Sequence, residues 1–232
     1  MKETMYDKLL QLPLFQGLCE DDITNILEKV KLHFNKHNKK HIIIEQGKPC
    51  DKLYFVLEGD VKAKYTDKQY GFSLEESFEG PYIIEPYSMF GMYPYLSATY
   101  TTEGVSSTMT IDKSYILTQL NKYEIFNLNF LNILSNRAQT IYYKLWNTHQ
   151  GNTEEKIINF IVLRCSNPTG PKNISIKMEV LAGLINDTRI NVSRALNKFQ
   201  KMGMMKLSRK VIIIPELETL THYIDQQNKT DK

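Results

Sequence analysis

Between residues 41 and 116, short runs of β-branched and aromatic residues alternate with glycines, and this pattern restricts the fold more than any other stretch. The runs are HIIIEQG, LYFVLEG, VKAKY, PYIIEP and STMTI, and glycines punctuate them at positions 47, 59, 71, 80 and 91. Turn signals about every 8 to 12 residues are typical of a small antiparallel barrel or sandwich. Before them, CEDDITNILEKV predicts a short amphipathic helix whose apolar face consists of Ile23, Ile26, Leu27 and Val30.

The stretch from about residue 122 to 148 contains neither glycine nor proline and predicts a long helix. Its apolar residues recur at alternating steps of three and four, which is a heptad seam suited to a partner helix. The seam consists of Leu131, Leu134, Ala138, Ile141 and Leu145. Because it is only about two heptads long, a helix buried within the same chain is the alternative. The pair Gly151-Asn152 is expected to end this helix.

The C-terminal third predicts a winged helix-turn-helix. A helix is expected at about 154–164, followed by the loop CSNPTGPKN, whose prolines cannot continue a helix. Two more helices are expected at about 178–184 and 188–202, separated by a tight turn, with Thr188 as N-cap and Gly203 after the last turn. MMKLSRKVIIIP then predicts a two-stranded hairpin, and helix, turn, helix and hairpin form the winged motif.

The last of these helices and the hairpin carry a concentrated positive charge. Between Asp187 and Lys210 there are seven basic residues and one acidic residue, a net charge of +6 in a chain whose total is +3. Such a surface suits the phosphates of DNA, and an ordinary pair of packed helices is the alternative. The residues expected to contact DNA are Thr188, Arg189, Ile190, Asn191, Ser193, Arg194, Lys198, Lys201, Arg209 and Lys210.

Nearly the whole chain resembles the CRP/FNR family of bacterial transcription regulators. The resemblance rests on PLFQGL and DDITNIL near the N-terminus, on IIIEQGKPCDKLYFVLEGDVKA, on SATYTT and on residues 176–215. It implies an α+β protein with a cyclic-nucleotide-binding-like β-roll (jelly roll) at 1–120, a dimerisation helix at 121–150 and a winged helix-turn-helix at 151–232. It also implies a homodimer that binds an inverted-repeat operator in double-stranded DNA, with RNA polymerase as a further candidate partner.

The recognition helix departs from the pattern of the family at one base-reading position. Regulators of this family read bases with an Arg-Glu-x-x-x-Arg pattern, of which Arg189 and Arg194 are present here, whereas Ile190 replaces the acid. Lys177 also stands where the family usually has a Ser or Thr that caps the first helix of the motif. That cap is therefore expected to be weaker by about 1 kcal/mol.

The stretch FGMYPYLSATYTT departs from the cassette with which relatives bind cyclic nucleotides. Gly91 is retained, but Met92 and Leu96 stand where the Glu and Arg that hold ribose and phosphate would be. A phosphate beside Leu96 would be unpaired, so we expect no binding of cyclic AMP or GMP. Any other effector, if one exists, is expected near Phe90, Gly91, Met92, Tyr93, Leu96 and Ser97. The aromatic residues of this region, Tyr82, Tyr87, Phe90, Tyr93, Tyr95 and Tyr100, either line a pocket or pack a β core.

Neither a cofactor nor a metal is expected. Three cysteines, at positions 19, 50 and 165, lack the spacing of a cluster or zinc site, and we expect them to be free thiols. His33, His37 and His41 are spaced by four, but FNKHNKKHIII predicts a loop that leads into a strand, with solvated histidines. No apolar run is long enough for a membrane span and no signal peptide is recognised, so a cytoplasmic protein is expected.

Two other function classes remain at this point. The first is a ligand-binding regulatory or scaffolding module whose winged domain contacts protein. The second is an enzyme, which we do not expect, because the sequence contains none of the fingerprints Gly-x-Ser-x-Gly, His-Glu-x-x-His, P-loop or dinucleotide-binding glycines.

Overall fold

The computed structural model describes residues 5–146 and 151–230. The chain divides into two compact units. Unit 1 comprises residues 1–63 and 78–139, and unit 2 comprises residues 64–77 and 140–232.

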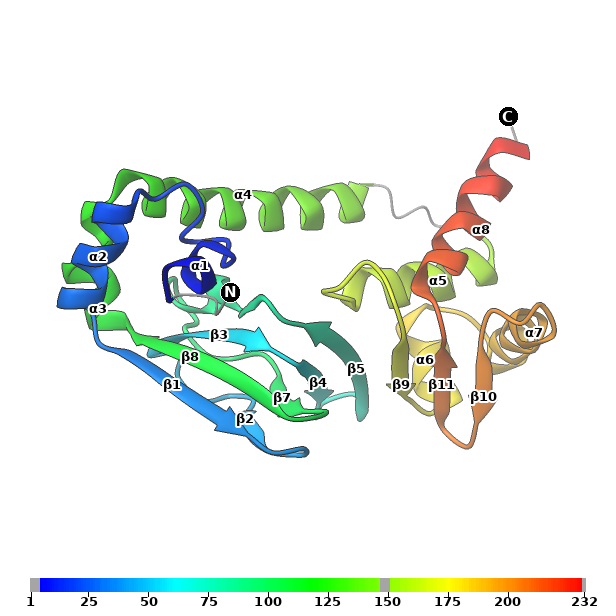
Figure 1. Cartoon of the computed structure of the whole chain (residues 1–232). Coiled ribbons are helices and arrows are strands. Elements are labelled where there is room, and N and C mark those ends of the chain that lie inside the picture. Colours follow the sequence, from blue (N-terminus) through cyan, green and yellow to red (C-terminus); the bar gives the residue numbers. More distant parts are fainter. Residues whose placement is uncertain (1–4, 147–150, 231–232) are drawn as a thin grey trace. The chain divides into compact units, whose positions relative to one another are not determined.

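Unit 1 is built on antiparallel strands, as the glycine-punctuated runs predict (Figure 1). One sheet has the order β1 (Leu32–His37), β8 (Ser106–Asp112), β3 (Lys52–Glu58) and β6 (Tyr82–Ile84). The other strands of this unit are β2 (Ile42–Ile44), β7 (Thr99–Thr102) and the first half of β4 (Asp60–Asp67). Side chains from alternating positions, such as Leu53 and Phe55 of β3 and Met109 and Ile111 of β8, are fully buried and form the core.

Short helices accompany these strands: α1 (Met5–Leu10), α2 (Glu20–Lys29), the 3-10 turns η1 (Pro86–Ser88) and η2 (Leu120–Lys122), and α3 (Lys113–Thr118). The predicted apolar face of α2 is correct for Ile23, Ile26 and Val30, which are buried. It is wrong for Leu27, which is 39% exposed. Consecutive residues point about 100° apart on a helix, so Leu27 cannot share the direction of Ile26.

The loop predicted around the histidines is wrong in its first half. Residues 32–37 form β1, which pairs with β8 along its whole length. The rings of His37 and His41 stack with centroids 4.6 Å apart, and His37 Nε2 lies 2.8 Å from Thr108 Oγ1. Burial, and then the neighbouring His41, lower the pKa of His37. Over the described residues, no group of His, Cys, Asp or Glu side chains is arranged to hold a metal ion, and Cys19, Cys50 and Cys165 are free thiols.

The long predicted helix is α4 (Glu124–Trp146), whereas residues 147 and 148 of the prediction lie outside the described part of the chain. Phe126 is the residue of α4 that is buried, and the centroid of its ring lies 5.7 Å from that of Phe15. Asn129 Nδ2 donates to the carbonyl oxygens of Leu14, at 3.3 Å, and Gln16, at 2.8 Å. Within the described residues, no helix is both long and apolar enough to cross a membrane.

Unit 2 contains the predicted winged motif. Its elements are α5 (Thr153–Arg164), β9 (Lys172–Ser175), α6 (Met178–Leu184), α7 (Arg189–Lys201), β10 (Lys206–Ser208), β11 (Val211–Ile214) and α8 (Leu217–Thr230) (Figure 1). Asn152 caps α5, since its side chain accepts hydrogen bonds from the N–H groups of Glu154 and Glu155. The predicted end of the preceding helix just before Gly151 lies outside the described residues. The strand β9 was not expected within and after the Pro-containing loop, and α8 was not expected either.

The winged sheet gains a strand from far earlier in the sequence. Four neighbouring strands of one larger sheet have the order β10, β11, β9 and β5 (Phe72–Glu79), and Ser73 of β5 pairs with Ser175 of β9. Leu74 lies in the hydrophobic cluster that also holds Phe199 of α7.

A buried carboxylate lies where the pairing of β5 with β9 ends. Glu76 is 1% exposed and accepts hydrogen bonds from the backbone N–H groups of Ser166 and Asn167 at 2.8 and 3.0 Å. Burial raises the pKa of Glu76, although these N–H groups and the charge of the fully buried Lys172 oppose that shift.

Candidate nucleic-acid interface

The turn between α6 and α7 is held by Asp187. Asn186 adopts a left-handed conformation (φ 50°), which reverses the chain. The Asp187 carboxylate then accepts hydrogen bonds from Thr188 N–H at 2.7 Å, from Asn191 Nδ2 at 2.9 Å and from the Thr153 hydroxyl of α5 at 2.7 Å. These hydrogen bonds lower the pKa of Asp187, the one from Asn191 contributing most. Asp187 thus ties the start of α7 to α5.

The predicted N-cap of α7 is confirmed. The Thr188 hydroxyl accepts a hydrogen bond from the N–H of Asn191 at 3.2 Å. The other N–H groups of the first turn lie at the positive end of the helix dipole, where phosphates bind readily. Gly203, with φ 75°, follows the last turn as expected. Lys177, by contrast, makes no side-chain cap to α6, as the sequence predicts.

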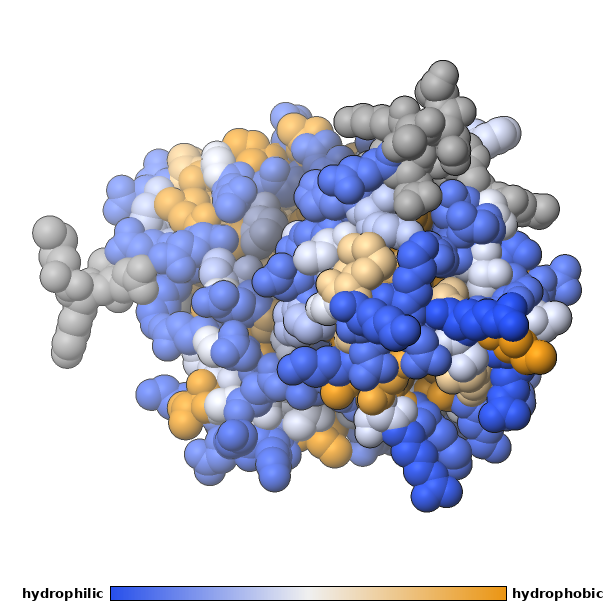
Figure 2. All heavy atoms as spheres, turned by 90° about the vertical axis from the view of Figure 1, so that its right-hand side faces the viewer, coloured by the Kyte–Doolittle hydropathy of each residue, from blue (hydrophilic) through white to orange (hydrophobic). Residues whose placement is uncertain are grey.

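The two faces of α7 differ sharply in exposure. Val192, Ala195, Leu196 and Phe199 are buried in the hydrophobic cluster of unit 2. Arg189, Ile190 and Arg194 are exposed on the first two turns, and the side chain of Ile190 is 64% exposed. Figure 2 looks onto the side of unit 2 on which α7 lies, and hydrophilic side chains cover much of it.

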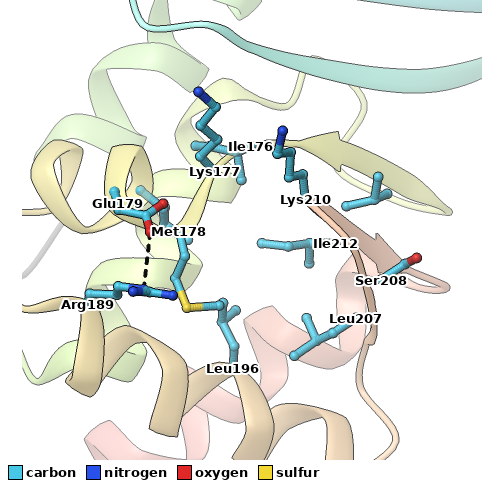
Figure 3. Close-up of a pocket in the computed structure, with 12 residues that line it drawn as sticks. Ile176, Lys177, Met178, Glu179, Arg189, Leu196, Leu207, Ser208, Lys210 and Ile212 are labelled. Carbon is cyan, nitrogen blue, oxygen red and sulfur yellow. Dashed lines mark ion pairs between the residues drawn. The ribbon is translucent and has the colours of Figure 1, made fainter.

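A cleft of about 250 Å³ lies beside this exposed face, between α6, α7 and the hairpin β10–β11. Leu181, Leu196 and Ile212 form part of its apolar lining. At its edge Arg189 Nε lies 3.2 Å from Glu179 Oε1 of α6 (Figure 3). Both side chains stay well exposed, at 68% for Arg189 and 62% for Glu179.

The hairpin supplies further positive charge. Arg209 and Lys210 form the turn between β10 and β11, and Lys210 has φ 63°. Both are exposed, and Lys177 and Lys210 extend to the same side of the cleft (Figure 3). The hairpin therefore presents cations at its tip that can meet a phosphate backbone.

Lys198 differs from the other predicted phosphate contacts. Its Nζ lies 2.8 Å from Glu154 Oε1 and 3.1 Å from the hydroxyl of Tyr223. Hydrogen bonds from Lys198 to Glu154 and Tyr223 raise the pKa of Lys198. Because Lys198 is already paired with a carboxylate of α5, we expect it to contribute less to phosphate binding than Lys201, which is exposed on the last turn of α7.

The face of α7 predicted to contact bases, here called the reading face, includes two half-buried polar residues, Asn191 and Ser193. Asn191 donates to Asp187, as described above, so its amide serves the turn. Ser193 Oγ accepts a hydrogen bond from Asn197 Nδ2 at 3.4 Å. Among the predicted base-reading residues of α7, the exposed ones are thus Arg189, Ile190 and Arg194.

The residues expected around an effector differ widely in exposure. Met92 and Tyr93 are 87% and 80% exposed, Phe90 and Gly91 are also exposed, and Leu96 is buried. The aromatic residues divide in the same way, since Tyr95 is 53% exposed and Tyr100 is fully buried. Neither of the two predicted arrangements, a pocket lined by these aromatic residues or a β core packed by them, therefore holds for all six residues.

A second buried carboxylate, that of Glu85, accepts hydrogen bonds from donors of this region. Glu85 is 1% exposed. Its carboxylate accepts hydrogen bonds from Ser97 N–H at 2.8 Å, the Ser88 hydroxyl at 3.0 Å and the Tyr100 hydroxyl at 3.2 Å. The backbone donor at Ser97 is therefore already paired with an anion of the chain itself.

The heptad seam of α4 is largely exposed in the single chain. Leu131 is 59%, Ile141 46% and Leu145 60% exposed, Ala138 is exposed as well, and Leu134 is half-buried. The alternative of a helix buried within its own chain is therefore wrong for most of the seam.

Four acidic residues that pair with other groups in these regions were not identified in the sequence analysis: Glu85, Glu154, Glu179 and Asp187. Each pairs with a residue of another element or on the other side of a turn, so no pattern in the neighbouring sequence predicts the contact. Asp187 alone had a local signal, because an Asp immediately before a helix N-cap often bonds the first N–H groups.

Comparisons with known proteins agree with this geometry. Residues 155–223 match the model of the Crp-like helix-turn-helix domain. The fold is similar to that of the Catabolite Activator Protein of Thermus thermophilus, which is 19% identical with a TM-score of 0.51 over 90% of this chain and 96% of that one.

Weaker similarities in structure were also found. They include CLP, a c-di-GMP-responsive global regulator of Xanthomonas campestris (16% identity, TM-score 0.49, 85% of this chain and 99% of that one). DNR of Pseudomonas aeruginosa is 19% identical with a TM-score of 0.46, covering 95% of this chain and 99% of that one. The sequence has no match among curated proteins.

Proposed function

Because the chain is of CRP type in its helix-turn-helix domain and its fold, we propose that it is a homodimeric, sequence-specific DNA-binding transcription regulator. Proteins of this type are not enzymes. The proposed organisation is a sensor domain at 1–120, a dimerisation helix at 121–150 and a DNA-binding domain at 151–232. The proposed site of action is the cytoplasm, and RNA polymerase is a candidate partner there.

One observation carries the proposal. The first two turns of α7 expose two arginines and an isoleucine, while the opposite face is buried in the core of unit 2. A recognition helix needs this division, since one face must be fixed so that the other can reach base edges in the major groove. Arg189 and Arg194 each suit guanine, whose O6 and N7 accept two hydrogen bonds from one guanidinium.

Dimerisation through α4 would place two such helices on one operator. An exposed seam that includes Leu131, Ile141 and Leu145 supports a partner helix, because a lone chain would leave this apolar surface in water. Two-fold symmetry then predicts an inverted repeat whose half-sites lie about 10–10.5 bp apart, centre to centre.

Selection of bound sequences from random duplexes tests this function, with wild type and Ile190→Glu compared side by side. The Ile190 methyl groups suit a thymine C5-methyl, whereas a Glu accepts from cytosine N4. We therefore expect an inverted repeat with thymine at the base pair that faces residue 190, and a change at that pair alone in the variant. Binding that depends neither on sequence nor on salt would favour a scaffold whose winged domain contacts protein.

We also propose that the sensor domain does not bind cyclic AMP. Leu96 supplies no cation, and the Ser97 N–H already donates to Glu85, so a cyclic phosphate at this place would meet a carboxylate. Calorimetric titration with cyclic AMP is expected to show no heat of binding, and a micromolar affinity would contradict the proposal.

A further inference from the structure

The acid beside the reading face comes from α6 and not from the recognition helix. The first turn of α7 contains no acidic residue, and Ile190 is exposed there. Glu179 instead reaches Arg189 from the first turn of α6, with Oε1 at 3.2 Å from Nε (Figure 3).

The atom of Arg189 that Glu179 contacts determines which N–H donors of the guanidinium remain available to a base. A guanidinium has five N–H donors in a fixed planar fork. A carboxylate on Nε leaves the two terminal nitrogens, Nη1 and Nη2, which form the end-on edge of the fork. That edge can donate two parallel hydrogen bonds to the O6 and N7 of guanine.

We propose that Glu179 is a positioning residue, which orients Arg189 through Nε so that its end-on edge is presented to a guanine. This inference rests on the proposed function, because it concerns the same reading face. Arg189 is 68% exposed and has many rotamers in water, and without the contact it would have to be ordered at the moment of binding. Ordering one such side chain weakens binding by about two- to tenfold.

A surface-charge role and a positioning role of Glu179 predict opposite changes in operator affinity when the acid is removed. If Glu179 were merely a surface charge, Glu179→Gln would reduce repulsion of the phosphates and tighten binding to every duplex. If it positions Arg189, the same change tightens non-specific binding yet weakens operator binding, by about two- to tenfold. Glu179→Asp keeps the charge but shortens the side chain, and should weaken operator binding without any gain on random DNA.

The experiment measures affinities of the full-length protein for its selected operator and for a duplex of scrambled sequence, at several salt concentrations. Glu216→Gln is the matched control, since Glu216 is an exposed acid between β11 and α8 and the charge change is identical. This control should change the two affinities equally or not at all. Melting temperatures of all variants should match wild type, because both partners of the ion pair are exposed.

A double-mutant cycle isolates the partnership. In an Arg189→Ala background, Glu179→Gln should no longer alter the ratio of operator to scrambled affinity. Parallel tightening on both duplexes in the single variant, or an unchanged ratio, would overturn the positioning role. A wild-type protein that shows no preference for any sequence would instead refute the proposed function itself.

Discussion

Helices α4 and α7 both bury part of their surface in the chain and expose the rest, but the exposed parts have opposite chemistry. α4 exposes Leu131, Ile141 and Leu145, whereas α7 exposes Arg189 and Arg194 around a single Ile190. Exposed apolar area is unfavourable in water at all times, while exposed arginines are well solvated. The seam of α4 therefore favours a permanent partner, and the reading face of α7 suits a partner that binds and leaves.

The largest expected effect comes from charging the seam of α4. Leu131→Lys together with Ile141→Lys should convert a dimer into monomers, because two lysines per chain cannot be buried against a second copy. A monomer loses the second half-site, so operator affinity should fall by at least about 100-fold. Sedimentation and mobility shifts measure both effects.

Asn132→Lys with Gln139→Lys is the control for that pair. It adds the same charge to α4 at two exposed polar positions outside the seam, which directly follow the seam residues Leu131 and Ala138 in sequence. The control should therefore leave the dimer intact. A charged seam that still sediments as a dimer would place the interface on another surface.

Arg194→Ala should have the next largest effect, and on the other helix. Loss of one bidentate contact should reduce discrimination between the operator and its single-base variants by about 1–3 kcal/mol at one base pair. Arg209→Ala, at the hairpin turn, should weaken binding to all duplexes alike. Equal losses on every duplex for Arg194→Ala would mean that this residue contacts phosphate.

A smaller effect separates two lysines of α7. Lys201→Ala should reduce the slope of log affinity against log salt by about one, because an exposed cation on a phosphate releases one counterion. Lys198→Ala should change the slope far less, since Glu154 already balances that charge. Equal slopes for the two variants would show that Lys198 leaves Glu154 when DNA binds.

The smallest effect concerns the start of α7. Asp187 has a pKa below its ordinary 3.8 because Asn191, Thr153 and Thr188 donate to it. A depressed pKa in the folded state adds stability above pH 3.8 that is lost as the pH falls through the folded value. Asp187→Asn should therefore lower the free energy of unfolding at neutral pH and flatten its decline below about pH 4. Urea denaturation at a series of pH values measures this, with Glu216→Gln as the charge-matched control.

The comparison of the two helices also shows what periodicity can predict. The helices predicted at about 178–184 and 188–202, the N-cap at Thr188 and the hairpin all follow from local signals, and the structure confirms them as α6, α7 and β10–β11. The seam of α4 was equally clear, but periodicity could not distinguish an exposed seam from one buried in the same chain. Exposure depends on what other segments cover, and those segments are distant in sequence.

The elements that the sequence did not reveal depend on distant partners. β9 begins within the loop that contains two prolines and is stabilised by β11 and by β5. The neutralised charge of Lys198 depends on Glu154 of α5, and the orientation of Arg189 on Glu179 of α6. A residue type and a helical position identify a candidate contact, but its availability is decided by side chains elsewhere.

The pairing of β5 with β9 also affects how the chain is made. A ribosome adds Ser73 about 100 residues before its partner Ser175, which at roughly 5–20 residues per second is a delay of about 5–20 s. Throughout that time β5 has an open edge, on which a strand of another nascent chain could pair. The same dependence applies in reverse to a fragment that begins at residue 151. It would carry the whole helix-turn-helix yet leave one edge of β9 unpaired, so it should aggregate unless residues 64–77 are supplied with it.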